Sequence, residues 1–316
     1  MKKFLSGLFK LNIVISVIII LFILSIVVSR IKVYNNIKNK NKILEKFGYS
    51  EKTGIFNEAA PAIFGGNVKL KHAVLLLHGY SASPFEFKSL FKEFEKNGIP
   101  YYAPLLTGFG QKDFHLLNNI KPEDWIRDAL TAYDLLAAFF EEISVIGHSN
   151  GSSLAVIVSS ERKVKKLILT GPNINVAASD KFYKDILNKP VLSSILKFYM
   201  PVFEKPFRKN RITNVDTIDT ESALSSFHYS ALPINSLAAV WKLQDYADIL
   251  KAKYESLTVI YGMNDLTVDV NSFLDFLKKN NIKYKDIGLK SSGHNVYDDF
   301  DKSEAVSETL KVFNEI

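Results

Sequence analysis

The feature that most constrains the fold is a G-x-S-x-G motif, Gly147–Gly151, set between two apolar segments. Residues 143–146 before it predict a strand, and residues 152–158 after it predict a helix. A strand that turns sharply into a helix needs small residues on both sides of the turn, and the serine between them is left exposed. The motif therefore predicts a nucleophile elbow with Ser149 as the nucleophile, and His148 packed beneath it. The alternative is that Ser149 is an ordinary helix N-cap.

A serine nucleophile needs a base, and the base needs a carboxylate to orient it. Asp265 follows the strand-like run 257–262, and His294 lies in the loop after the strand-like run 284–289. The order Ser149, Asp265, His294 along the chain is the order expected for this elbow. We therefore predict Ser149 as nucleophile, His294 as base and Asp265 as acid. Three other carboxylates are alternatives for the acid: Asp269, Asp298 and Asp299.

The oxyanion formed in such a reaction needs two backbone donors, and one of them should be the amide after the nucleophile. That amide belongs to Asn150. The second donor should come from the loop after an early strand, and residues 73–77 followed by His78-Gly79-Tyr80 supply one. We assign the amide of Tyr80 to this role. Its ring is then either a pocket wall or a packing group.

Strands and helices alternate along the chain, with amphipathic helices predicted at 84–97 and 122–140. Such alternation predicts an α/β fold, with a mostly parallel sheet covered by helices on both faces. The stretch 172–233 interrupts the rhythm and predicts a helical cap over the site. Its large apolar residues either form a lipophilic roof or hold the cap onto the core. They are Phe182, Tyr183, Ile186, Leu192, Ile195, Phe198, Tyr199, Met200, Phe203 and Phe207.

Several sequence blocks accompany the elbow in order: 78–84 (HGYSASP), 102–110 (YAPLLTGFG), 122–125 (PEDW), 262–268 (GMNDLTV) and 292–294 (SGH). Together they resemble the α/β-hydrolase family, within it the monoacylglycerol lipase and carboxylesterase branch, from about Lys71 to the end. Two positions depart from the usual pattern. Asn150 stands where Met or Gln is usual, and residues 108–110 read Gly-Phe-Gly in place of Gly-His-Gly.

The resemblance implies a serine esterase that forms an acyl-enzyme and needs no cofactor. The expected partner is a small-molecule acyl ester or lipid, such as a monoacylglycerol-like or medium-chain ester. Acyl transfer and amide or peptide cleavage are alternatives on the same fold. A catalytically silent, membrane-tethered binding protein is an alternative from another class.

Composition removes several other classes of function. The chain has no cysteine, which excludes a thiol nucleophile, disulfides and cysteine-ligated zinc. Its six histidines show no H-E-x-x-H spacing, so no metal site is predicted. The net charge of +7 does not indicate a nucleic-acid binder. The first 46 residues contain nine of the 40 Lys and Arg residues but only one of the 33 Asp and Glu residues. This segment therefore has a net charge of +8, and the rest of the chain has a net charge of −1.

The segment 11–29 contains no charged residue and is long enough to cross a bilayer as a helix. We therefore expect a single-pass N-terminal membrane anchor in residues 1–46, in contact with membrane lipids, followed by a catalytic domain in residues 47–316. The alternative is a cleaved signal peptide. Basic residues flank both sides of the segment. Because the more basic flank of a membrane span usually faces the cytoplasm, their numbers slightly favour a cytoplasmic catalytic domain. The sequence carries no signal for the oligomeric state.

Overall fold

The computed structural model describes residues 13–25, 27–28, 31, 41–66, 71–174, 184–186, 189–199, 202–204 and 216–314. The chain divides into two compact units, residues 1–43 and 44–316. In the first unit, residues 13–25, 27–28 and 31 are helical, and the large apolar side chains from Ile13 to Leu24 are each 45–60% exposed. Within the ranges described, no helix has both the length and the apolar character needed to cross a membrane. The predicted anchor segment 11–29 lies partly outside these ranges.

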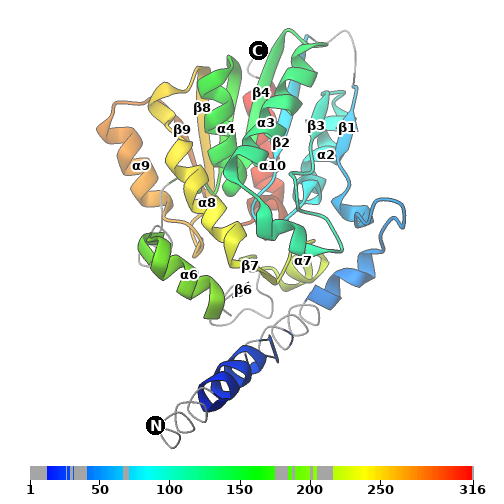
Figure 1. Ribbon diagram of the computed structural model, residues 1–316. Coiled ribbons are helices and arrows are strands. Elements are labelled where there is room, and N and C mark those ends of the chain that lie inside the picture. Colours follow the sequence, from blue (N-terminus) through cyan, green and yellow to red (C-terminus); the bar gives the residue numbers. More distant parts are fainter. Residues whose placement is uncertain are drawn as a thin grey trace, which may run out of the picture. The chain divides into compact units, whose positions relative to one another are not determined.

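The second unit is built on a seven-stranded sheet with the strand order β1-β3-β2-β4-β5-β8-β9 (Figure 1). All neighbouring strands pair in parallel except β1, which runs antiparallel to β3. This confirms the predicted α/β architecture with a mostly parallel sheet. The strands are β1 (Ala62–Phe64), β2 (His72–Leu77), β3 (Tyr101–Ala103), β4 (Glu142–His148), β5 (Val164–Thr170), β8 (Tyr254–Gly262) and β9 (Lys285–Leu289).

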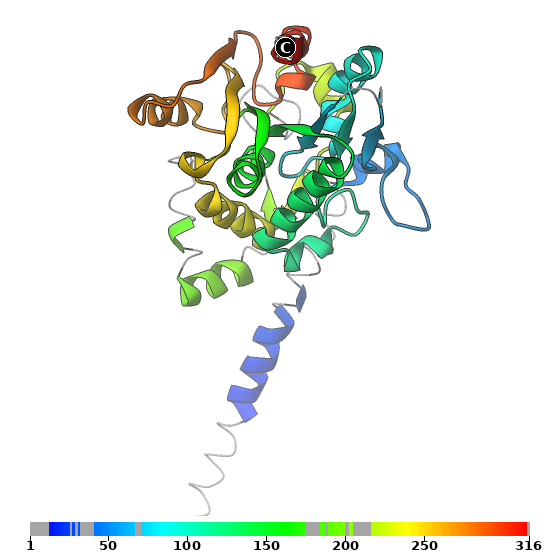
Figure 2. The same ribbon diagram turned by 90° about the horizontal axis from the view of Figure 1, so that it is seen from above.

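Helices cover both faces of the sheet, as Figure 2 shows. One face carries α2 (Lys88–Lys96) and α10 (Lys302–Asn314), whose aromatic side chains Phe94 and Phe313 meet edge to face with ring centroids 5.6 Å apart. The other face carries α3 (Pro122–Ala137), α4 (Asn150–Glu161) and α8 (Ile234–Tyr246), and α9 (Val270–Lys279) follows β8. Short 3-10 helices are η1 (Asn41–Phe47), η2 (Asn57–Ala59), η3 (Pro84–Phe87), η4 (Phe114–Asn119), η5 (Ile249–Lys251) and η6 (Val296–Asp298).

Central strands are buried on both faces because helices cover them. In β2, every residue after His72 is buried, which explains its uninterrupted apolar sequence. The carboxyl ends of β4, β8 and β9 carry the elbow and the two loops with the predicted acid and base. The sheet therefore brings together residues that are far apart in the sequence.

The described part of the predicted cap holds α6 (Pro190–Tyr199), α7 (Thr220–Ser225) and an antiparallel pair of strands, β6 (Val202–Glu204) and β7 (Ala231–Pro233). The sequence predicted helices alone, and the two-stranded sheet is an addition. Pro233 has no N–H group to donate, and it is tolerated because it stands at the end of β7 and directly precedes α8. Six side chains of the predicted roof lie outside the description: Phe182, Tyr183, Tyr199, Met200, Phe203 and Phe207.

Candidate active site

The elbow places Ser149 between the end of β4 and the start of α4. Its backbone has φ 54° and ψ −118°, a positive φ that non-glycine residues adopt rarely and at an energetic cost. A Cβ at Gly147 would lie 2.3 Å from the Gly151 carbonyl oxygen, and one at Gly151 would lie 1.9 Å from the Leu77 carbonyl oxygen. The turn therefore requires both glycines, as the motif predicted.

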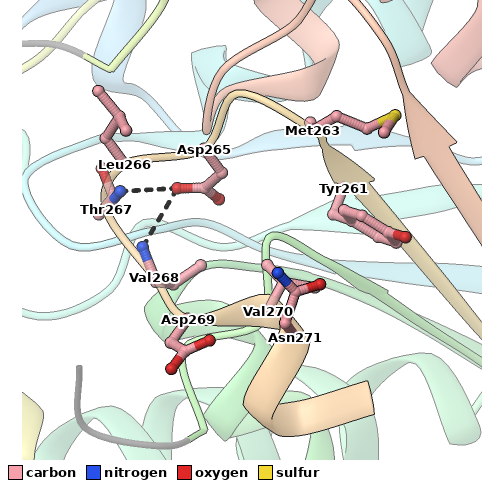
Figure 3. A pocket seen from close by; sticks show the side chains of 10 residues that line it. Tyr261, Met263, Asp265, Leu266, Thr267, Val268, Asp269, Val270 and Asn271 are labelled. Carbon is pink, nitrogen blue, oxygen red and sulfur yellow. Dashed lines mark hydrogen bonds between the residues drawn. The ribbon is translucent and has the colours of Figure 1, made fainter. Parts of the chain in front are cut away.

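The loops after β8 and β9 bring Asp265 and His294 into contact, because these strands are neighbours in the sheet. Asp265 Oδ2 lies 2.7 Å from His294 Nδ1, and both side chains are buried. Asp265 Oδ1 accepts hydrogen bonds from the backbone amides of Thr267 and Val268 at 2.7 and 3.1 Å (Figure 3). Burial opposes its ionisation, but the nearby His294 and the hydrogen bonds to this carboxylate outweigh burial and keep the pKa of Asp265 below its usual range.

The contact with Asp265 also fixes the state of the histidine ring. With Asp265 ionised, Nδ1 of His294 carries a proton and donates a hydrogen bond to the carboxylate, which leaves Nε2 as an acceptor in the neutral ring. Nε2 is buried and has no hydrogen-bond partner among the described residues. This is the nitrogen that a base needs to take a proton from a serine.

The three alternative carboxylates bond elsewhere. Asp269 caps α9 by accepting from the Ser272 amide and hydroxyl at 3.1 and 2.6 Å. Asp298 pairs with Lys88, with Oδ1 3.2 Å from Nζ. Asp299 is fully buried and accepts four backbone N–H groups. The geometry therefore favours Asp265 as the partner of His294.

The loop that holds Tyr80 passes directly beside the nucleophile, since a Cβ at Gly79 would lie 3.2 Å from Ser149 Cβ. His78 orients this loop. The amide of Leu106 donates to His78 Nε2 at 3.1 Å, so Nδ1 carries the proton and donates to the Gly79 carbonyl at 2.9 Å. Burial lowers the pKa of His78 to about 4, so the ring stays neutral. Because the Gly79 carbonyl and the Tyr80 N–H belong to one planar trans peptide, fixing the carbonyl also fixes the N–H.

The Tyr80 side chain connects this loop to α8. Its hydroxyl lies 2.6 Å from Ser236 Oγ, which itself donates to the Pro233 carbonyl, so Tyr80 is the donor to Ser236. Its ring packs against the buried cluster Ile234, Leu237 and Trp241. Phe109, from the unusual Gly-Phe-Gly, contacts the Tyr80 ring edge to face with centroids 5.8 Å apart. The ring is thus a packing group between this loop and α8, and its alternative role as a pocket wall stays a prediction.

Two buried residues, Glu86 and His148, lie behind the site. Glu86 Oε2 accepts from the Gly79 amide at 2.9 Å, and its Oε1 lies 3.5 Å from His148 Nε2. His148 lies next to the base, with the two imidazole centroids 4.8 Å apart. Burial, with a smaller contribution from His294, lowers the pKa of His148 to about 3. Sequence reasoning placed His148 under the elbow but missed Glu86, because a glutamate in an amphipathic helix predicts a solvent-facing side chain.

The segment that returns from the cap holds both the acid loop and the base loop. The Asp216 carbonyl accepts from the His294 amide at 2.8 Å, and its Oδ2 accepts from the Leu266 amide and the Thr267 hydroxyl. Asp299 joins the Gly293 amide to the amides of residues 218 and 219. No sequence signal marked these long-range contacts.

A pocket of about 410 Å³ opens beside the acid, and Figure 3 shows its lining side chains. All of them belong to residues 261–271, so it is a pocket of the acid loop and the start of α9. Across the part of the chain that the structure covers, no group of three or more His, Asp or Glu side chains is arranged to hold a metal ion.

Comparison with known proteins agrees with the fold. The family model described as "Serine aminopeptidase, S33" matches residues 68–230, more than half of the chain. A carboxylesterase of Bacillus subtilis is 22% identical over 214 residues, which cover 67% of this chain and 78% of that protein. The structure of a monoacylglycerol lipase from Paleococcus ferrophilus is similar with a TM-score of 0.62 and 15% identity, over 79% of this chain and 96% of that one. A thermostable carboxyl esterase from Bacillus coagulans, solved with glycerol, gives a TM-score of 0.65 and 16% identity, over 81% and 93% of the two chains.

Proposed function

The chain belongs to the serine aminopeptidase S33 family and is a serine ester hydrolase with the α/β-hydrolase fold, and we propose that it cleaves monoacylglycerol-like or medium-chain acyl esters through Ser149, His294 and Asp265. The observation that carries the assignment is the 2.7 Å contact between Asp265 and His294 Nδ1. This contact leaves Nε2 of His294, in the loop after β9, as the ring nitrogen that can accept a proton.

In the proposed mechanism, Ser149 Oγ attacks the ester carbonyl while His294 Nε2 takes its proton. Asp265 holds the imidazole in the required tautomer and stabilises the imidazolium. The amides of Tyr80 and Asn150 receive the oxyanion. His294 then protonates the leaving alcohol, and water hydrolyses the acyl-enzyme with His294 again as base.

The proposed substrate class rests on the relatives and on the apolar composition of residues 172–233. Proteins with similar sequence or fold are named carboxylesterase and monoacylglycerol lipase. Each acyl methylene buried beneath an apolar cap adds about 0.8 kcal/mol of favourable transfer free energy, which is roughly a fourfold gain if the transition state keeps it. We therefore expect kcat/KM to rise from acetyl to medium-chain esters and then to level off.

Two measurements test this proposal. A fluorophosphonate probe should label wild-type protein and should fail to label the Ser149→Ala variant. Rates on aryl esters of two to sixteen acyl carbons, measured below their aggregation limits, should rise and then level off. An unlabelled wild-type protein would overturn the serine mechanism, and a steady fall from acetyl onward would overturn the acyl-chain preference.

A second candidate reaction is amide cleavage at the same serine, which the description of the matching family favours. Aminoacyl p-nitroanilides and p-nitrophenyl esters of equal acyl size separate the two. Faster turnover of the anilides would make the protein a peptidase or amidase.

We also propose that the N-terminal segment attaches the protein to a membrane as a single-pass anchor. The support is the uncharged run 11–29, the apolar side chains exposed along its described helix, and the +8 charge of residues 1–46. Full-length protein should sediment with membranes and resist extraction by high salt and by alkaline carbonate. Release by carbonate would indicate peripheral attachment and overturn the spanning anchor.

A further inference from the structure

The side chain of Asn150 is an exception among the buried polar groups of the elbow. It is fully buried at the start of α4, directly after Ser149. Neither its carboxamide oxygen nor its nitrogen has a hydrogen-bond partner among the residues described. A buried carboxamide without partners loses its hydrogen bonds to water and gains none in return, so such groups are rare and call for an explanation.

The neighbouring polar side chains show that the elbow does not generally leave such groups unpaired. Ser152 Oγ donates to the Gly147 carbonyl at 2.7 Å, and Ser153 Oγ donates to the Asn173 carbonyl at 2.6 Å. On the other side of Ser149, His148 is bonded through both ring nitrogens. Among the described polar side chains of the elbow itself, Asn150 is therefore the residue whose buried polar atoms lack a partner.

We propose that the Asn150 carboxamide binds a hydroxyl group of the substrate close to the scissile ester, an assignment that rests on the proposed esterase function. A carboxamide offers both a donor and an acceptor, and a hydroxyl group can satisfy both at once. The backbone amide of the same residue is the proposed oxyanion donor, so a bound ester carbonyl lies beside Asn150. A hydroxyl a few bonds from that carbonyl comes within reach of its side chain.

Two kinds of ester carry a hydroxyl at this distance. In a monoacylglycerol-like ester the hydroxyl belongs to the alcohol, and in a 3-hydroxyacyl ester it belongs to the acyl chain. In both, the site recognises the same chemistry. An ester with a methyl group in place of the hydroxyl would leave the carboxamide unpaired in the complex, which lowers kcat/KM for that ester.

The test uses two matched ester pairs in which a hydroxyl replaces a methyl group. The alcohol-side pair is 2-hydroxyethyl butanoate with propyl butanoate. The acyl-side pair is p-nitrophenyl 3-hydroxybutanoate with p-nitrophenyl 3-methylbutanoate. The readout is the ratio of kcat/KM within each pair. It is measured for wild type and for two variants, Asn150→Leu and Asn150→Met. Leucine has a shape similar to that of asparagine but carries no hydrogen-bonding groups. Asn97→Leu, at an exposed position that ends α2, is the control for an Asn-to-Leu change elsewhere.

We expect wild type and Asn97→Leu to prefer the hydroxyl ester of one pair by roughly tenfold or more, and both Asn150 variants to bring that ratio close to one. The pair that responds identifies which side of the ester carries the hydroxyl. The Asn150 variants should also melt at or above the wild-type temperature, because they remove a buried unpaired group. Equal ratios in wild type and Asn150→Leu for both pairs would overturn the assignment. Absence of fluorophosphonate labelling in wild type would instead overturn the esterase function on which it rests.

Discussion

Two carboxylates on one side of the nucleophile and a carboxamide on the other differ in how they are bonded. On the side of the acid and base, Asp265 and Asp299 accept hydrogen bonds from several backbone amides. On the side of α4, the Asn150 carboxamide has no partner among the described residues. Under the proposed function, the first side must keep a fixed geometry through the reaction, and the second meets a substrate that supplies its own hydrogen bonds.

The largest effect is expected from the acid and base side itself. Ser149→Ala, His294→Ala and Asp265→Asn should each lower ester turnover by on the order of 10³-fold or more, because triad members act as a unit. Steady-state kinetics on a p-nitrophenyl ester measures the loss, and circular dichroism checks that each variant is folded. The matched control is Asp269→Asn, which alters a cap of α9 and should leave turnover nearly intact. Normal turnover in Asp265→Asn would contradict the acid assignment.

The next largest effect is expected on the stability of the protein, through Asp299 on the acid and base side. Each carboxylate oxygen of Asp299 accepts hydrogen bonds from two backbone N–H groups. Asp299→Asn replaces one of these oxygens by an amide nitrogen, which cannot accept a hydrogen bond. Losing two hydrogen bonds to a charged acceptor should lower the free energy of unfolding by about 3 to 6 kcal/mol. Urea denaturation measures it. The exposed Asp275→Asn on α9 should change stability by less than about 0.5 kcal/mol. A similar stability for both variants would show that Asp299 does not hold the loops.

These two predictions differ in how far the sequence alone leads to them. The elbow, the strands that carry the acid and base, and the sheet class follow from local patterns of glycine and apolar residues. Asp299 does not, because two of its partners, the amides of residues 218 and 219, lie 81 and 80 residues away in the sequence and no local pattern encodes such a contact. Glu86 does not, because a glutamate in an amphipathic helix predicts a solvent-facing side chain. The two-stranded sheet in the cap was missed for a related reason, since three-residue strands are too short to show an alternating pattern.

A smaller effect is expected from Glu86, which we interpret as a positioning residue for the Gly79-Tyr80 loop. Glu86→Ala removes the acceptor of the Gly79 amide, so the Tyr80 amide should shift from its place and kcat should fall by roughly tenfold with little change in KM. Glu86→Gln retains an amide oxygen that can accept this bond and should recover much of the rate. Binding of a boronic acid, which mimics the tetrahedral intermediate, should weaken in parallel with kcat. An equal fall in both variants, or a change in KM alone, would argue against a positioning role.

The smallest effect is the response of stability to pH through His148, the histidine beneath the elbow. The pKa of His148 is about 3 in the folded protein against an ordinary value of 6.5, so between these values the unfolded chain binds a proton that the folded protein does not. Stability is therefore full above about pH 6.5 and falls as the pH drops. Replacing His148 by Gln should reduce the slope of the unfolding free energy against pH by about 1.4 kcal/mol per pH unit in the range between 4 and 6. Urea denaturation at half-unit pH intervals measures the slope. A stability slope unchanged in the variant would mean that His148 is charged beside the base.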